Sequence, residues 1–201
     1  MYCLNFIRAR LAEHRPQRYE LGEHTREAAV AVILRARPED IGILFIKRAD
    51  KRGDPWSGHM AFPGGHREPG DADARAAAER ETLEEIGLDL TGAEYLGPLD
   101  QQRAMPRGRS LDMVIEPHVF SLDHDPALTP NFEVQEVVWT PLTPLARNLR
   151  HDTETRPMAG RPTTFNGYRL ERGHFVWGLT YRMLKSFFTT LDPDWQPVDQ
   201  D

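Results

Sequence analysis

The chain lacks the features that mark secreted, membrane-spanning and nucleic-acid-binding proteins. It holds one cysteine, Cys3, among 201 residues, so no disulfide can form within it and nothing requires an oxidising compartment. No stretch approaches the ~20 apolar residues of a membrane helix, and residues 1–14 lack the apolar run of a signal peptide. The net charge of -6 gives no general attraction to nucleic acid or to an anionic membrane. We therefore expect a cytoplasmic protein that binds neither.

Several well-known catalytic signatures are also missing. The eight histidines are scattered, without H-E-x-x-H or the Cys/His spacing of zinc sites. The chain contains no G-x-S-x-G motif, no P-loop and no Rossmann G-x-G-x-x-G fingerprint. Zinc, serine-nucleophile, P-loop and dinucleotide chemistries therefore find little support.

The most informative feature present is a group of acidic residues at helical spacing. Glu81, Glu84 and Glu85 stand at positions i, i+3 and i+4, which share one face of a helix. Like charges placed so closely repel one another, and a bound divalent cation would stabilise them, because Mg²⁺ and Mn²⁺ prefer oxygen ligands. The alternative is a solvated acidic face that forms ordinary ion pairs with Arg75 and Arg80.

The helix that carries these glutamates has recognisable ends. Asp71 or Asp73 can cap its start, and Gly87 suits the left-handed residue that often ends a helix. At ~100° per residue, apolar residues fall on the side opposite the glutamates. We expect that side to pack against the core through Ala72, Ala76, Leu83 and Ile86.

The residues around the acidic group complete a longer pattern. Gly64 and Gly65 precede the helix, and glycines let the backbone turn sharply and approach a ligand closely. From Gly65 to Leu88 the chain resembles the Nudix box, G-x5-E-x7-R-E-U-x-E-E-x-G-U, where U is apolar. Thr82 stands at one apolar position. The box is one residue longer than the pattern, so Asp71 or Ala72 takes the place of its first glutamate, although a plain N-cap explains Asp71 equally well.

The resemblance extends to about residues 27–190 and points to one subgroup. The segments 44–49 and 58–65, the second of which matches G-x3-F-P-G-G fully, are similar to the signature of Nudix coenzyme A pyrophosphatases. Ile46 replaces a threonine of that signature, and Arg52 lies at a different distance from Gly58. Residues 176–184 look like the closing helix of the same subgroup.

The resemblance implies an α/β (α+β) fold in which a mixed sheet is sandwiched between helices and the box forms a loop–helix–loop. We expect a helical and polar segment at 1–24, a Nudix domain at 25–191 and a disordered acidic tail at 192–201. Loops are expected at 101–110 and 151–162, a hairpin turn at Asn166-Gly167, and the last helix at 177–191. The other expected elements are a helix at 4–13, a turn of helix near 141–145, and strands at 28–34, 41–47, 60–62, 94–99, 113–120 and 134–140.

The resemblance also implies roles for the residues of the box. Glu81 and Glu85 are expected to be the principal ligands of Mg²⁺ (or Mn²⁺), with Glu84 contributing directly or through water. The backbone oxygen of Gly65 adds a ligand. Arg80 orients a glutamate by a charge-assisted hydrogen bond.

The general base and the substrate-binding residues are less sharply defined. Glu133 and Glu136 are candidates for the base, although either can be an exposed charge at a strand end. Loop arginines are candidates for binding phosphates, because guanidinium matches phosphate geometry, and some of them will simply lie on the surface: Arg48, Arg52, Arg103, Arg107 and Arg109. Trp56, Phe165 and Tyr168 are candidates for stacking on a base, whereas Trp139 and Trp177 are expected in the core.

We expect the partner to be a small-molecule nucleoside diphosphate derivative. Coenzyme A or an acyl derivative is the leading substrate, giving 3′,5′-adenosine diphosphate and phosphopantetheine or its acyl form. A second interpretation keeps the chemistry but takes ADP-ribose, a dinucleotide or another nucleoside diphosphate derivative. A third is a Nudix-fold binding module without catalysis. The oligomeric state stays open, with a homodimer among the alternatives.

Overall fold

A computed structural model describes residues 2–53, 56–104, 112–158 and 160–198. Its helices are α1 (Leu4–Glu13), α2 (Ala74–Ile86), α3 (Leu142–Ala146) and α4 (Gly178–Leu191). Its strands are β1 (Arg26–Ala36), β2 (Ile41–Arg48), β3 (Met60–Ala61), β4 (Gly64–His66), β5 (Glu94–Pro98), β6 (Gln102–Ala104), β7 (Met113–Leu122), β8 (Val134–Pro141), β9 (His151–Met158), β10 (Arg161–Arg169) and β11 (Phe175–Trp177).

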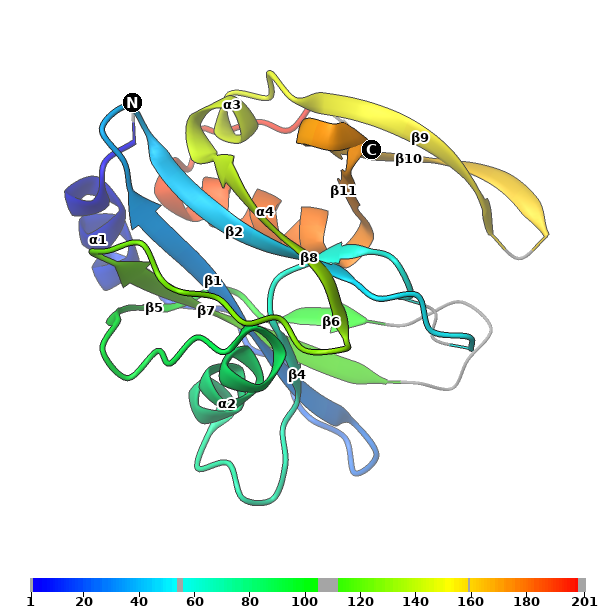
Figure 1. Ribbon diagram of the computed structural model, residues 1–201, viewed down its shortest axis with the longest axis horizontal. Coiled ribbons are helices and arrows are strands. Elements are labelled where there is room, and N and C mark those ends of the chain that lie inside the picture. The colour runs from blue at the N-terminus through cyan, green and yellow to red at the C-terminus, as the bar shows by residue number, and fades with distance from the viewer. Residues whose placement is uncertain (1, 54–55, 105–111, 159, 199–201) are drawn as a thin grey trace.

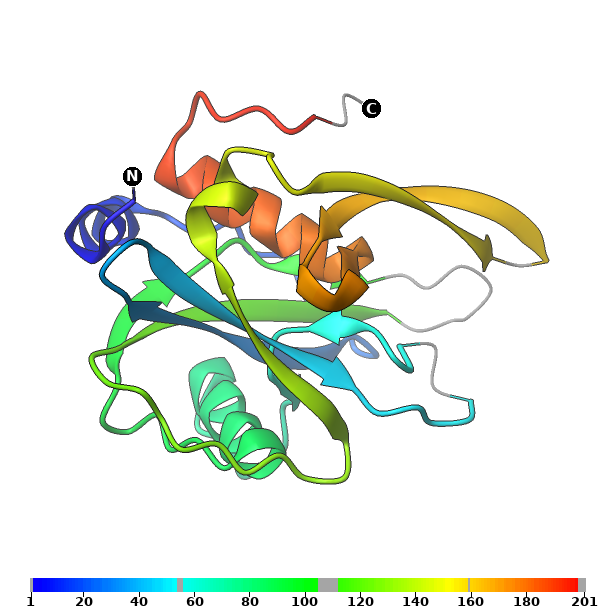
Figure 2. The ribbon, with the colours of Figure 1, turned by 45° about the horizontal axis from the view of Figure 1, so that its top comes forward.

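The core of the fold is an eight-stranded mixed sheet with the order β3-β2-β1-β7-β5. Strands β1 and β7 run parallel, and the other pairs are antiparallel, with β4 on β1, β6 on β7 and β8 on β2. Figure 2 shows α2 on one face of this sheet and α1 and α4 on the other. The expected sandwich of a mixed sheet between helices is therefore confirmed.

Side-chain alternation along β1 explains the two layers. Ala29, Ala31 and Ile33 pack in one cluster with Ala77, Ala78 and Ile86 of α2. Their neighbours Ala28, Val32 and Leu34 pack in a second cluster with Ile7 of α1 and Phe187 and Phe188 of α4. Successive strand residues point to opposite faces. A strand covered on both faces reads as a continuous apolar run, which is why β1 and β2 were recognisable in the sequence.

The second sheet, β11-β10-β9, departs from the sequence expectation. Residues 151–162, expected to be a loop, contain β9 and the start of β10. The expected hairpin turn at Asn166-Gly167 is wrong, because β10 runs straight through both residues, which pair with Thr153 and Asp152. A β carbon on Gly167 would lie 2.2 Å from the carbonyl oxygen of Val176 in β11, so this glycine allows a close strand approach. Figure 1 shows the long β9–β10 hairpin extending away from the main sheet.

Two further segments are more ordered than expected. Within the expected loop at 101–110, Gln102–Ala104 forms β6 against β7; residues 105–110 lie outside the described part. Trp195 contradicts the expected disorder of residues 192–201, because it is only 9% exposed. Its ring packs on Phe188 and its Nε1 donates to the carbonyl oxygen of Ala146. Residues 199–201 lie outside the described residues.

The residues of α2 that face the core also differ from those expected from the helical periodicity. Leu83 is 50% exposed, and Ala72 lies before the helix and is exposed. The buried face consists of Ala77, Ala78, Thr82, Glu85 and Ile86. Small residues let α2 approach β1 closely, and the hydroxyl of Thr82 donates to the carbonyl oxygen of Ala78, which makes its burial tolerable. The helix ends are as expected, since Asp73 is the N-cap and Gly87 is the left-handed C-cap.

Within the described ranges, no helix is both long and apolar enough to cross a bilayer. The cytoplasmic location, the oligomeric state and the division at residues 24 and 191 stay predictions of the sequence.

Candidate active site

The backbone at Gly64 and Gly65 positions two glutamates of α2. Gly64 has a φ of +148°, and a β carbon there would lie 2.2 Å from the carbonyl oxygen of Ala29, so only glycine fits. Its N–H donates to Glu85 Oε2 at 2.9 Å. A β carbon on Gly65 would lie 2.5 Å from the carboxylate of Glu81. The two glycines therefore let the β4 backbone pass directly beside both carboxylates.

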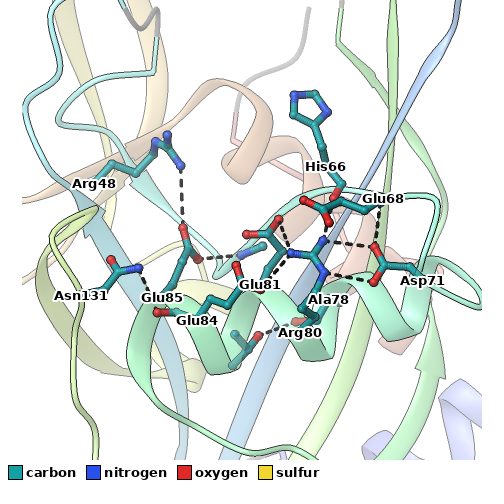
Figure 3. A network of polar contacts seen from close by, with 12 residues as sticks. Arg48, His66, Glu68, Asp71, Ala78, Arg80, Glu81, Glu84, Glu85 and Asn131 are labelled. Atoms are coloured by element: carbon teal, nitrogen blue, oxygen red, sulfur yellow. Dashed lines mark hydrogen bonds and ion pairs between the residues drawn. The ribbon is translucent and has the colours of Figure 1, made fainter.

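Arg80 holds the acidic group together from one side (Figure 3). Its guanidinium donates to both carboxylate oxygens of Asp71 at 3.0 and 3.1 Å, and also to Glu81 at 3.0 Å and Glu84 at 3.3 Å. A further N–H donates to the carbonyl oxygen of His66. Hydrogen bonds from Arg80 lower the pKa of Asp71. Asp71 is thus the partner of Arg80, and the N-cap alternative for Asp71 is wrong because Asp73 fills that position.

Burial makes the carboxylate of Glu85 unusual. Glu85 is 2% exposed, and the loss of solvent raises its pKa to about 7, opposed by the Gly64 N–H and by Arg48. The Arg48 guanidinium lies 3.9 Å from Glu85 Oε1. Burial likewise raises the pKa of Glu81, against the effect of Arg80. Glu84 is different, because its side chain is 55% exposed and faces Arg80 from the rim.

Glu81 and Glu85 border a cavity of about 1050 Å³. Polar and charged side chains reach it from the box and its surroundings: Arg48, His59, His66, Glu68, Glu81, Glu85, Glu133, Thr163, Thr180 and Arg182. The rest of the lining is apolar, with aromatic rings from β10, β11 and the loop before β3, and with aliphatic side chains and methionines from β1, β7 and α4. A cavity of this size, with a few polar groups in an apolar wall, is typical of a small-molecule site.

The oxygen donors in this cavity fit a hard divalent cation. In the described part of the chain, no three His, Cys, Asp or Glu side chains already lie together as a metal centre. However, Glu81 and Glu133 both raise the pKa of Glu85, so the three negative charges act on one another across the same cavity. A cation that bound between them would relieve this repulsion, and oxygen ligands suit Mg²⁺ or Mn²⁺.

The structure separates the two candidates for the general base. Glu133 lines the cavity, and its Oε1 lies 3.7 Å from Lys51 Nζ. Asn131 anchors its loop to α2, because the Asn131 side-chain amide donates to the carbonyl oxygen of Glu84. Glu136, three residues further along the chain in β8, accepts hydrogen bonds from Arg172 and His174 and is not among the residues that line the cavity.

The predicted phosphate-binding arginines are similarly divided. Arg48 borders the cavity. Arg52 is exposed and does not line it. Arg103 forms a bidentate pair with Asp112 at 2.7 and 2.6 Å, which lowers the pKa of Asp112 to about 2, and it also lies outside the lining. Arg107 and Arg109 lie outside the described residues.

Two of the aromatic residues lie in the opposite place from the one expected, Tyr168 in the core and Trp177 at the cavity. Trp56 and Phe165 line the cavity as expected, but Tyr168 is fully buried and packs on Tyr181 and Phe188. Trp177, which was expected in the core, is a wall of the cavity, with its ring centroid 4.5 Å from that of Phe165. Trp139 is partly buried, and Arg35 lies over its ring at 4.3 Å.

Sequence reasoning missed several polar residues of the lining, His59 and Arg182 among them. The ring of His59 packs against that of Trp177 at an angle of 59°, with centroids 4.6 Å apart. Arg182 lies on α4, opposite its strongly apolar side. The helical spacing of the buried Thr180, Tyr181, Met183 and Leu184 shows that Arg182 faces outward, but only the position of α4 over the sheet brings it to the cavity.

Comparisons with known proteins agree with this geometry. A family model described as the NUDIX domain matches residues 24–159. The mouse peroxisomal coenzyme A diphosphatase NUDT7 is 38% identical over 116 residues, which are 57% of this chain and 46% of that protein. The mouse mitochondrial coenzyme A diphosphatase NUDT8 is 30% identical over 162 residues, 78% of this chain and 74% of NUDT8. The chain spans less than half the length of the curated relatives that it matches with 38% identity.

A solved structure shows the same fold. The crystal structure of a MutT/nudix family protein from Enterococcus faecalis has a TM-score of 0.56 and 19% sequence identity, and the match covers 95% of this chain and 70% of that one. At this identity the likeness concerns the arrangement of the sheet and helices alone.

Proposed function

Since the chain belongs to the Nudix family, we propose that it is a divalent-metal-dependent diphosphatase that cleaves coenzyme A or an acyl-coenzyme A. The products are 3′,5′-adenosine diphosphate and phosphopantetheine or its acyl form. The observation that carries this proposal is the cavity that joins the half-buried Glu81 and the buried Glu85 to a mixed aromatic and aliphatic wall.

The residues of the box would hold the cation. Glu81 and Glu85 would be its principal ligands, the backbone oxygen of Gly65 would add another, and Glu84 would contribute from the rim, where it is more exposed. Mg²⁺ or Mn²⁺ would neutralise charge on the diphosphate oxygens and activate a water molecule. Arg80, itself held by Asp71, keeps Glu81 oriented through a hydrogen bond of 3.0 Å. Arg48 places a positive charge beside the same centre and binds the diphosphate.

Glu133 is the favoured general base. It lines the cavity, and its loop is anchored to α2 by Asn131, so its carboxylate can accept a proton from the attacking water. Glu136 is disfavoured, because Arg172 and His174 already engage both of its oxygens.

The lining of the cavity favours coenzyme A over the alternatives. Coenzyme A carries a purine base at one end of its diphosphate and, at the other, a flexible chain in which alkyl segments alternate with two amides. The cavity offers aromatic rings at Phe165 and Trp177 and aliphatic or methionine side chains at Val30, Met113 and Met183. ADP-ribose presents a second polar sugar instead, and a dinucleotide presents a second base. The relatives NUDT7 and NUDT8, named as coenzyme A diphosphatases, support the same choice.

A non-catalytic Nudix-fold binding module is the alternative of a different class. Loss of the box glutamates would favour it, and here Glu81, Glu84 and Glu85 are all present. The fit of these residues to a cation supports an enzyme.

The test is hydrolysis by the purified protein with Mg²⁺ or Mn²⁺, using coenzyme A, an acyl-coenzyme A, ADP-ribose, NADH and diadenosine polyphosphates in parallel. Chromatography should show 3′,5′-adenosine diphosphate and phosphopantetheine from coenzyme A, and none in excess EDTA. Efficient cleavage of ADP-ribose without any turnover of coenzyme A would replace the proposed substrate. Binding without cleavage of any of them would favour the non-catalytic module.

A further inference from the structure

Arg182 is a cation that the diphosphate chemistry does not use. It lies in α4, and its side chain borders the cavity that holds Glu81 and Glu85. Helix α4 covers the face of the sheet opposite to α2, the helix that carries the glutamates (Figure 2). Arg182 therefore approaches a ligand in the cavity from a different layer of the fold, and it contacts a different part of that ligand from the part held by the carboxylates.

The guanidinium of Arg182 is held in place without being neutralised. Its Nη1 donates to the carbonyl oxygen of Arg103 in β6 at 3.2 Å, which ties the side chain to the main sheet. Among the described residues, no carboxylate lies within ion-pair distance of it. Because guanidinium has five N–H donors in a planar fork, most of them remain for an anion.

The other described arginines near the cavity are engaged differently. Arg48 lies beside Glu85 at the carboxylate centre. Arg103 forms a bidentate pair with Asp112, and Arg156 is paired with Glu154 and lies over the ring of Trp177. A second phosphate on the ligand, separate from the diphosphate, would thus meet Arg182.

The position of Arg182 also suits a nucleotide. Helix α4 begins at Gly178, directly after the cavity wall Trp177, and its first turn is tied to β3 by a hydrogen bond from Thr180 to the carbonyl oxygen of Met60. At 1.5 Å per residue, Arg182 lies about 6 Å along the axis from Gly178. A base that packs against the aromatic wall formed by Phe165 and Trp177 would therefore have its ribose, and any phosphate on that ribose, within reach of Arg182.

We propose that Arg182 binds the 3′-phosphate of the adenosine moiety and so determines a preference for coenzyme A over dephospho-coenzyme A. This inference rests on the proposed function, because the 3′-phosphate is the group that separates those two substrates. Arg52 and Arg103, two of the arginines that the sequence offered for phosphate binding, do not line the cavity, whereas Arg182 does.

The experiment compares kcat and KM for coenzyme A and dephospho-coenzyme A with Mg²⁺. One charge-assisted contact gives a preference of roughly ten- to hundred-fold in kcat/KM for coenzyme A. Arg182→Ala should bring the two values together by raising KM for coenzyme A, and Arg182→Lys should keep part of the preference. Arg161→Ala, an exposed arginine outside the cavity lining, is the control and should keep the full preference. Equal kcat/KM values in the wild type, or an intact preference in Arg182→Ala, would overturn the role of Arg182.

A second measurement separates this inference from the proposed function. Calorimetry in EDTA compares the binding of 3′,5′-adenosine diphosphate and AMP, with no turnover involved. Tighter binding of the former that Arg182→Ala removes supports the site even if coenzyme A proves not to be hydrolysed. Equal affinity for the two nucleotides in the wild type overturns it, even if coenzyme A is hydrolysed well.

Discussion

Gly65 and Glu81 approach one another so closely that a β carbon on Gly65 would lie 2.5 Å from the Glu81 carboxylate carbon. The neighbouring Gly64 is constrained in a different way, because there the obstacle is the backbone oxygen of Ala29 at 2.2 Å. The two glycines therefore have different roles: the lack of a side chain at Gly65 leaves room for Glu81, the proposed metal ligand, and the lack of one at Gly64 allows β4 to pair with β1.

Alanine at each position should separate these roles. Gly65→Ala should fold with a melting temperature close to that of the wild type, because the end of a flexible side chain can move, and should lose activity and metal affinity, because Glu81 is displaced. Gly64→Ala should lose stability by roughly 1–3 kcal/mol, since backbone cannot move as cheaply and φ is positive. Thermal melts and metal titrations of both variants check this. Unchanged metal affinity in Gly65→Ala would count against Glu81 as a ligand.

Removing the charge of Glu85 should abolish most of the activity but not the fold. Glu85→Gln keeps an acceptor for the Gly64 N–H, yet it removes a contact to the cation, which costs about 3–4 kcal/mol in the transition state, or roughly 10²–10³ in kcat. Glu79→Gln is the matched control, because Glu79 lies on the same helix, pairs with Arg75 and does not line the cavity. Normal turnover by a folded Glu85→Gln enzyme would contradict the assignment.

Asp71 should act on the cation through Arg80. In Asp71→Asn the bidentate pair with Arg80 loses its charge, so Arg80 orients Glu81 less well. Partners of this kind typically contribute ten- to hundred-fold in metal affinity, so the Mg²⁺ concentration for half-maximal rate should rise by about that factor. Asp73→Asn should leave it unchanged, since asparagine is an equally good N-cap. A normal Mg²⁺ dependence in Asp71→Asn would reduce Asp71 to a structural role.

His118 should make the fold sensitive to acid. It is buried in β7 and its Nδ1 is hydrogen-bonded to the hydroxyl of Tyr95. Burial lowers its pKa below the ordinary 6.5, more strongly than the nearby Glu116 raises it. Below that ordinary value the unfolded chain therefore binds a proton that the native protein resists, so the free energy of unfolding falls as the pH drops from about 7 toward the lowered pKa.

The check is urea denaturation of the wild type and His118→Gln over this pH range. The variant should lose part of the acid-induced fall, whereas His124→Gln, which removes an exposed histidine, should keep it. An equally steep fall in His118→Gln would show that other groups cause the acid sensitivity.

Local signals in the sequence were enough for the box and for most of the main sheet. The cap at Asp73, the left-handed Gly87 and the spacing of Glu81, Glu84 and Glu85 act within a few residues of one another. The apolar runs of β1 and β2 follow from burial on both faces, which composition alone reveals. These features did not depend on any distant segment, so they could be predicted together with the family resemblance.

Several errors concern contacts between different elements of the fold, which the pattern within one element does not reveal. Asn166-Gly167 has the composition of a tight turn, but pairing with β9 and β11 extends β10 through it. Leu83 is the largest apolar residue of its helix turn, yet the close packing of Ala77 and Ala78 on β1 leaves it outside. The composition around Trp195 is that of a polar tail, but its ring packs on Phe188 of α4.

The cavity shows the same division. The helical spacing of Glu81 and Glu85 predicts that they belong to the site. Trp177 and Arg182 reach it only because α4 crosses the sheet beside β3 and β6. Spacing within a helix depends only on neighbouring residues, so it can be predicted from the sequence. Arg182 on α4 and the carboxylates on α2 come to the same cavity only after the whole sheet has formed between the two helices. Burial of both faces of the sheet holds the helices in these positions.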